Sequence, residues 1–422
     1  MSESEEEAKI GPLYEYKPLL LDRHELTEAL GAYLYREFKN KVTVEFPSPA
    51  TDGQWRLTSQ GYVGFVPLPD GRTLELLSKT PLGNLFHMLE YTFDIEPLGG
   101  LVSVATLDDF YDRLATLLAK MIDERSRRGI YREYIPRNDR LAYLRGSLDV
   151  RRLATRPWDP FPHCRFQEHT PDIDDNRLLT WTLYNIARGG RAGPRSLPHV
   201  RRAYHTMESF ARSAPFTAVD CTDRRYNRLN EDYERLHALC RFFLDAAGPQ
   251  LDSGEKQMVP FLIDAAGLYE KFVAAWLHRN ATNHYVVSDQ ARVDFEGTPD
   301  MQARIDLTLG RRGSDRVLCV LDTKYKASAD PEYSDLYQVT TYALSQGCRD
   351  AFLVYPERLK PTLDIIIRSE YEPGQKVRVR SLTFPVRDAA CVADAELDAC
   401  GQAFLRDLAA ALPEQKLALV AG

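Results

Sequence analysis

Two apolar segments joined by a short turn constrain the fold of this 422-residue chain more than any other feature. Residues 305–309 alternate apolar with polar side chains, which is typical of a strand with one buried face. Residues 317–321 are almost continuously apolar, as expected of a strand buried on both faces. Because the residues between them, Gly-Arg-Arg-Gly at 310–313, favour a turn, the two segments are predicted to be neighbouring strands.

Charged residues accompany both strands. Asp306 lies within the first, and Asp322 and Lys324 follow the second, two residues apart and so on one side of an extended chain. Charges at the end of a buried strand are costly unless they are paired or bind a metal. Two aspartates suit Mg²⁺, and a nearby lysine can orient a water or stabilise charge that develops on a phosphate. The pattern predicts metal-dependent phosphodiester hydrolysis, although Asp-x-Lys alone is more often a solvated turn.

Two predicted helices could add residues to this site. Glu270 lies beside the apolar stripe of a helix over 265–277, where it could be a further site acid or, equally, an exposed side chain on a polar face. Gln338 belongs to a helix over 335–343 that precedes a buried strand over 351–355. The order strand, helix, strand predicts a right-handed parallel crossover, which would place Gln338 near the metal or a DNA backbone.

The flanking regions predict an α/β protein in two or three parts. Residues 1–105 read as a β-rich module with one helix, which starts at Asp22 with Glu25 as its capping partner and runs to about Lys39. Residues 106–258 read as a helical middle region, and residues 259–422 contain the strands described above. Further strands are expected over 363–367 and 377–384, and a final helix over 389–412.

An arginine-rich segment interrupts the middle region. Residues 125–156 contain ten arginines against three acidic residues, a net charge of +7, whereas the whole chain has a net charge of −7. Tyrosines are interleaved with the arginines, a combination that suits phosphate contact and stacking. A surface for DNA or for a protein partner is expected here, with a solvated or acid-paired face as the alternative. The candidate contact residues are Arg127, Arg128, Arg132 and Arg145.

Composition excludes several other classes of protein. No apolar segment approaches the roughly 20 residues of a membrane span, and the acidic residues 1–7 do not resemble a signal peptide. Seven scattered cysteines without zinc spacing fit the reduced thiols of a cytoplasmic protein. The sequence has no P-loop, so any nucleotide hydrolysis would belong to a partner.

The ordered set of motifs resembles the McrC family, the nuclease subunits of McrBC-type, modification-dependent restriction systems. The residues that carry the resemblance are Lys79 with 84–89, 145–150, 172–177, 268–273, 305–307, 321–326, 336–338 and 342–343. Two positions depart from the family pattern, because Ser78 and Ile305 stand where it has proline. The matches cover most of the chain and keep the order of the family.

The resemblance implies a PD-(D/E)xK restriction-endonuclease-like domain over 259–422, with a mixed central sheet flanked by helices. Asp306, Asp322 and Lys324 occupy the three places of its motif. Asp306 and Asp322, with Glu270, would bind Mg²⁺, and Gln338 would assist. The resemblance further implies that residues 1–105 dock on a ring of AAA+ GTPase partners and stimulate their hydrolysis, and that the complex cleaves double-stranded DNA carrying modified cytosine.

Two other functions remain open from the sequence. The chain could be an adaptor with an inactive nuclease fold that only activates its partner, although the intact Asp306, Asp322 and Lys324 argue against a decayed site. It could also be a nuclease that acts without a motor subunit. Cleavage by the isolated chain would indicate the latter.

Overall fold

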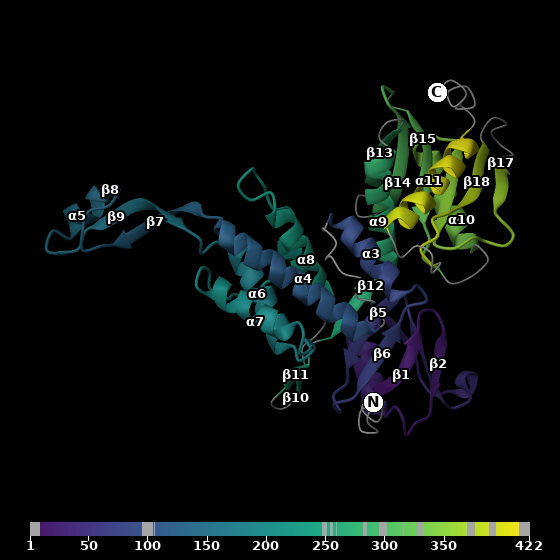
Figure 1. The fold of residues 1–422 in the computed structure, drawn as a ribbon, viewed down its shortest axis with the longest axis horizontal. Coiled ribbons are helices and arrows are strands. Elements are labelled where there is room, and N and C mark those ends of the chain that lie inside the picture. The colour runs from purple at the N-terminus through teal and green to yellow at the C-terminus, as the bar shows by residue number, and fades with distance from the viewer. Residues whose placement is uncertain are drawn as a thin grey trace. The chain divides into compact units, whose positions relative to one another are not determined.

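The computed structural model divides the chain into two compact units, one formed by residues 1–110 with 260–422 and the other by residues 111–259 (Figure 1). It describes residues 9–94, 104, 106–246, 251–253, 256–258, 260–281, 285–294, 302–314, 316–326, 332–368, 376–387 and 394–412. The acidic stretch 1–7, the domain limits expected at 105 and 259 and the expected start of the last helix at 389 lie outside these residues. Within them, six cysteines are free thiols.

A six-stranded mixed sheet forms the centre of the first unit. Its strand order is β13 (Tyr285–Asp294), β14 (Gln302–Arg311), β15 (Val317–Thr323), β16 (Asp350–Tyr355), β18 (Lys376–Thr383) and β17 (Asp364–Arg368). The hairpin expected from the sequence is the antiparallel pair β14–β15. The expected crossover is also present, because β15 and β16 are parallel and α10 (Tyr333–Ser345) connects them.

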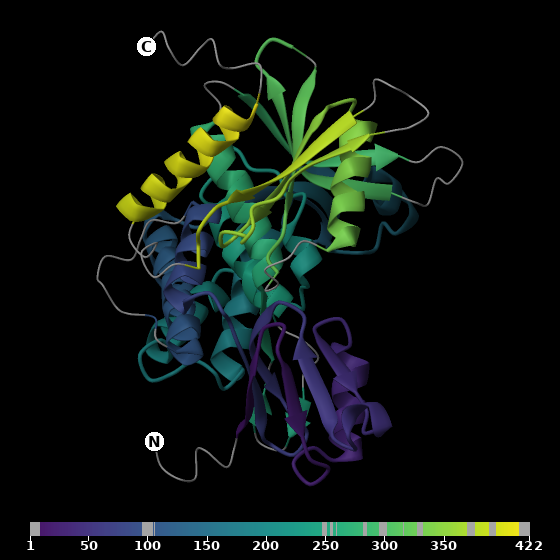
Figure 2. The same ribbon diagram turned by 90° about the vertical axis from the view of Figure 1, so that its right-hand side faces the viewer.

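Helices cover both faces of this sheet, as Figure 2 shows for α10 and α11 (Asp394–Ala411). Val320, Leu353 and Val379 of the strands form one core with Val339 and Ala343 of α10. A second aromatic core joins α9 (Ala265–Asn280), α11 and the residues after β18, through Trp276, Phe384 and Phe404. The sheet is therefore buried on both sides, which explains why β15 and β16 are almost wholly apolar.

The N-terminal residues belong to the same unit as this sheet, which differs from the separate module expected over 1–105. The reason is β12 (Phe261–Asp264), which pairs antiparallel with β5 (Tyr62–Pro67). The pairing requires Gly64, which has a φ of 140°, because a Cβ there would lie 1.9 Å from the Phe261 carbonyl oxygen. The four-stranded sheet has the order β1 (Lys9–Tyr14), β6 (Thr73–Leu77), β5 and β12.

A three-stranded sheet and two helices complete the N-terminal part. The elements are β2 (Pro18–Leu21), β4 (Trp55–Ser59) and β3 (Val42–Glu45) in that order, with η1 (Pro49–Thr51), α2 (Glu28–Phe38) and α3 (Leu82–Thr92). The helix start expected at Asp22 is wrong. The Glu25 carboxylate does accept from the Asp22 amide at 2.8 Å, but this bond closes a turn, and α2 begins at Glu28.

The second unit is only partly helical, which corrects the helical middle region expected from the sequence. Its helices are α4 (Leu107–Arg128, from Tyr111 onward), α6 (Asp174–Arg188), α7 (Leu197–Glu208), η2 (Ala218–Cys221) and α8 (Tyr233–Ala246). The remaining elements are the hairpin β10 (Leu251–Ser253) and β11 (Lys256–Met258), and the sheet β7 (Glu133–Arg140), β9 (His163–Thr170) and β8 (Ser147–Leu148) with α5 (Val150–Thr155). β7 is exposed along most of its length, so no apolar alternation marks it.

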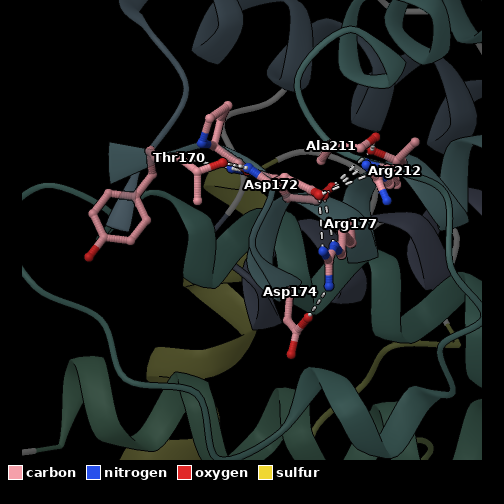
Figure 3. A network of polar contacts seen from close by, with 10 residues as sticks. Thr170, Asp172, Asp174, Arg177, Ala211 and Arg212 are labelled. Atoms are coloured by element: carbon pink, nitrogen blue, oxygen red, sulfur yellow. Dashed lines mark hydrogen bonds and ion pairs between the residues drawn. The ribbon is translucent and has the colours of Figure 1, made fainter. Parts of the chain in front are cut away.

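Residues 172–177 form a network of hydrogen bonds and ion pairs in the second unit (Figure 3). Asp172 accepts hydrogen bonds from Arg177 Nε at 2.8 Å and Nη2 at 3.0 Å, and from the Arg212 amide at 3.0 Å. Arg177 holds the pKa of Asp172 below its usual range. These bonds fasten the start of α6 to the chain that follows α7.

No helix in the described part of the chain combines the length and apolarity of a membrane span.

Candidate functional site

The register of β14 and β15 brings Asp306 and Asp322 to adjacent positions on neighbouring strands. Leu307 pairs with Leu321 in this antiparallel pair. Asp306 precedes Leu307 and Asp322 follows Leu321, so both lie on the same side of that pair. Asp306 is then fixed through one oxygen, because Oδ2 accepts from the Thr323 amide at 2.7 Å and from its hydroxyl at 2.8 Å. Asp306 is thereby held at the end of β15, the strand that carries Asp322.

Lys324 joins the second acid to α10. Its Nζ lies 2.6 Å from Asp322 Oδ2 and donates to Gln338 Oε1 at 3.0 Å. The Gln338 amide in turn donates to the Tyr342 hydroxyl at 2.9 Å. The Lys324 backbone is also anchored, because its N–H donates to Val354 of β16 at 2.8 Å. Lys324 therefore contacts two other predicted site residues, Asp322 and Gln338.

Glu270 lies within electrostatic reach of both aspartates. Burial raises its pKa to about 7, with further raising contributions from Asp306 and Asp322 and a lowering one from Lys271. The pKa of Asp322, which is only 1% exposed, is also raised to about 7, mainly by burial; Lys324 lowers it and Asp306 raises it. Glu270 is half-buried and accepts from the Gln290 amide. Glu270 is thus partly buried, and the negative charges of Asp306 and Asp322 act on it.

The donor set fits a divalent cation. Carboxylate oxygens are the ligands that Mg²⁺ prefers, and a bound cation would favour the ionised carboxylates, which burial and mutual repulsion disfavour. Asp322 Oδ2 is buried, and the Lys324 ammonium lies 2.6 Å from it. The three carboxylates are not gathered around one point, however. Among the described residues, only the exposed Asp22, His24 and Glu25 form a group of three such side chains within 4.8 Å.

The sequence analysis did not predict two further residues that lie near these side chains. Asp335, in the first turn of α10, is 3% exposed, accepts from Lys326 Nζ at 2.9 and 3.1 Å and lies 3.7 Å from Lys324 Nζ. Its position three residues before Gln338, on one helix face, is the signal that could have identified it. Gln290 of β13 adopts a φ of 53° and donates to Glu270.

Comparison with known proteins decides the family. A sequence model described as the McrBC 5-methylcytosine restriction system component matches residues 57–356. The chain belongs to the McrBC family. No curated protein sequence matches it. Of the five solved chains that match, one comes from Thermococcus gammatolerans McrB AAA+ hexamers with bound McrC. It shares 18% identity, covers 95% of this chain and 100% of its own, and has a TM-score of 0.56.

A second structural match is the cryo-EM structure of the Thermococcus gammatolerans McrBC complex. Here the identity is 19%, the coverage is 65% of this chain and 88% of the other, and the TM-score is 0.43. At these identities the first match supports a common fold. It agrees with the mixed α/β architecture of this member of the McrBC family.

In the arginine-rich segment of this McrBC-family chain, some arginine side chains contact an acidic or aromatic side chain and others are exposed. Arg127, Arg128 and Arg132 are exposed and have no side-chain partner among the described residues, whereas Arg145 stacks on the Phe166 ring at 4.2 Å. Other arginines pair with acids: Arg125 with Asp232, Arg137 with Glu168 and Arg140 with Asp159. Exposed apolar side chains accompany the segment, namely Tyr134, Tyr143, Leu144, Val150, Trp158 and Phe161.

Proposed function

We propose that this chain is the nuclease subunit of a restriction complex that cleaves double-stranded DNA carrying modified cytosine. The observation that carries the proposal is the assembly of Asp306, Asp322, Lys324 and Gln338 at the end of β15 in a chain of the McrBC family. The proposal assigns a PD-(D/E)xK nuclease fold to the six-stranded sheet and its helices, within residues 259–422.

Each residue has a chemical role in this proposal. Asp306, Asp322 and Glu270 would hold Mg²⁺, which when bound acts as a Lewis acid and makes a water easier to deprotonate. The Lys324 ammonium would orient the attacking water or stabilise negative charge on the phosphate. Gln338, itself held by Tyr342, keeps that ammonium beside Asp322. Burial of Asp322 strengthens these interactions because the local dielectric constant is low.

The proposed partner is an AAA+ GTPase. The related Thermococcus gammatolerans structure contains McrB AAA+ hexamers with bound McrC. This chain has no P-loop of its own, so GTP hydrolysis would belong to the other subunit. The surface of residues 9–94 is proposed to dock on the ring and stimulate hydrolysis. The exposed arginines of the second unit would contact DNA phosphates or acidic side chains of the partner.

The alternative function is an adaptor that stimulates the GTPase without cutting DNA. One observation favours it: the three proposed metal ligands do not form a group within 4.8 Å among the described residues. The intact set of Asp306, Asp322 and Lys324 favours the nuclease.

Plasmid cleavage distinguishes the possibilities. The purified chain would be incubated with Mg²⁺ and methylated or unmethylated plasmid, with and without the GTPase encoded beside it and GTP. We expect cutting only with partner, GTP and methylation, and none with Asp322→Ala. The matched control is Asp364→Ala, which removes an exposed aspartate from β17 of the same sheet. GTPase stimulation without cutting would favour the adaptor, and cutting by the chain alone would indicate a nuclease that needs no motor.

A further inference from the structure

The chain leaves the central sheet directly after Lys324. Strand β15 ends at Thr323, and of residues 324–326 only Lys324 continues the hydrogen bonding to β16, through its N–H and Val354. A lysine that orients a water must be placed to within a fraction of an ångström. Contacts of the next two residues, Tyr325 and Lys326, can fix the backbone that carries Lys324.

Tyr325 is buried between two parts of the first unit. It is 3% exposed, and its hydroxyl donates to Thr80 Oγ1 at 2.6 Å and lies 3.4 Å from Ser78 Oγ. The Thr80 amide donates to Ser78 Oγ at 2.9 Å, and the intervening Lys79 amide donates to the buried carboxylate of Glu15 at 3.1 Å. The turn over 78–80, which follows β6, is thus ordered by its own hydrogen bonds and presents two hydroxyls to Tyr325.

The ring of Tyr325 contacts the helix that carries Glu270. Its centroid lies 5.7 Å from that of Tyr269, the fully buried neighbour of Glu270 on α9. The Arg387 guanidinium lies over the Tyr325 ring, 5.2 Å from its centroid, and donates to the Lys326 carbonyl at 3.2 Å. Arg387 is itself held by Glu357 at 2.6 Å. Tyr325 is therefore next to Lys324 in sequence and next to Tyr269 in space.

A phenylalanine would fill this space equally well, so the hydroxyl calls for an explanation. Burying a hydroxyl is unfavourable unless it is hydrogen-bonded, and the bond to Thr80 fixes both the ring and the backbone that carries it. We propose that Tyr325 is a positioning residue that ties Lys324 and Glu270 to the turn over 78–80. The inference rests on the proposed nuclease function, and it makes the N-terminal sheet a structural part of the site.

The test combines a matched pair of variants with two readouts. Tyr325→Phe and Thr80→Val each remove one hydroxyl of the same hydrogen bond at nearly constant volume. Tyr337→Phe is the control, because Tyr337 is 69% exposed on α10. Amide hydrogen exchange over residues 322–326 reports the anchoring without any catalysis. Steady-state cleavage of methylated plasmid by the complete complex reports its catalytic consequence as separate values of kcat and KM.

We expect about tenfold faster exchange over 322–326 and about tenfold lower kcat in both variants, with an unchanged KM for DNA and unchanged GTPase stimulation. The double variant should be no worse than either single one, because both remove one bond. The control should match the wild type in both readouts.

Three results would overturn the inference. Unchanged exchange would show that the hydroxyl does not anchor the segment. Faster exchange with an unchanged kcat, in a wild type that cleaves, would show that the anchoring has no role in positioning Lys324. A loss of kcat explained entirely by a smaller folded fraction would reduce Tyr325 to a stabilising residue. A wild type that never cleaves would instead reject the proposed function, and the exchange readout would still decide the anchoring.

Discussion

At the scale of single residues, the contact between Lys324 and Asp322 dictates the outcome of substitution at either position. Replacing Lys324 by methionine keeps the length of the side chain but leaves Asp322 buried without its cation, which costs on the order of 3 kcal/mol. We expect Lys324→Met to lower cleavage about a hundredfold or more while GTPase stimulation persists. The measurement is cleavage of methylated plasmid at a temperature where circular dichroism shows the variant folded. Normal cutting would place the catalytic lysine elsewhere.

Asp335 offers a second prediction at this scale. Because it is buried and accepts from Lys326 while lying near Lys324, Asp335→Asn should lower the cleavage rate about tenfold by removing a negative charge that helps to position both ammonium groups. Glu332→Gln is the matched control, since Glu332 is exposed and contacts only Lys326 of the two lysines. Equal effects of the two substitutions would show that general negative charge near α10 matters and the position of Asp335 does not.

Glu15 yields a prediction of pH dependence. Burial raises its pKa to about 7 from an ordinary 4.5, so the folded state keeps a proton that the unfolded chain releases between these values. The free energy of unfolding therefore falls as pH rises from about 4.5 to 7, by on the order of 3 kcal/mol. Glu15→Gln should remove this contribution, and its melting temperature relative to wild type should rise across that window. Exposed Glu25→Gln is the control, and a constant difference between pH 5 and 8 would contradict the assignment.

The strand or helix that carries a site residue could be predicted where the neighbouring residues form a local pattern. Asp306 lies within one apolar strand, Asp322 and Lys324 come at the end of another, and Gln338 shares a helix face with Tyr342, so a local pattern places each on its element. Gln290 reaches the site through its backbone conformation, which leaves no local signature, whereas Asp335 could have been found from its helix spacing to Gln338. Tyr325 was visible in the motif, but its partners Ser78 and Thr80 lie about 245 residues away, beyond any pattern in the sequence.

At the scale of elements, exposure explains which strands the sequence could indicate. β14, β15 and β16 carry buried side chains in the period or run length expected of strands. β7 pairs with β9 over its whole length but presents mostly exposed polar residues, so its only sign in the sequence was charge. The arginines that suggested a binding surface are thus presented in part by a strand pair that hydrophobic periodicity does not detect.

The free arginines near this strand pair can be tested as a group. Reversing Arg127, Arg128 and Arg132 to glutamate should weaken DNA binding about uniformly across sequences and reduce its salt dependence if they contact phosphates. If they contact the partner, GTPase stimulation should fall instead. The matched control reverses Arg195, Arg201 and Arg228, which are also exposed and unpaired among the described residues of the same unit. Unchanged DNA binding together with unchanged GTPase stimulation would indicate that these arginines lie on a solvated face.

At the scale of the whole molecule, the order of the chain and the division into units do not coincide. The second unit is continuous over 111–259, whereas the first needs residues from both ends of the chain. The fragment 106–258 contains α4, α6, α7 and α8 with their buried side chains, among them Leu118, Leu179 and Leu239. We expect this fragment to fold alone, with a cooperative thermal transition followed by circular dichroism.

The fragment 260–422 should behave differently, although it contains every proposed catalytic residue. Strand β12 would lose its partner β5, Tyr325 would lose Thr80, and α9 would lose the packing of Tyr91 on Phe272. We expect it to expose apolar surface, to bind a hydrophobic dye and to show no protection of amides 322–326. Adding a separately produced fragment 9–94 should restore that protection, because the missing contacts come from it. A fragment 260–422 that is protected and cuts DNA alone would mean that the nuclease sheet is independent of the N-terminal sheet.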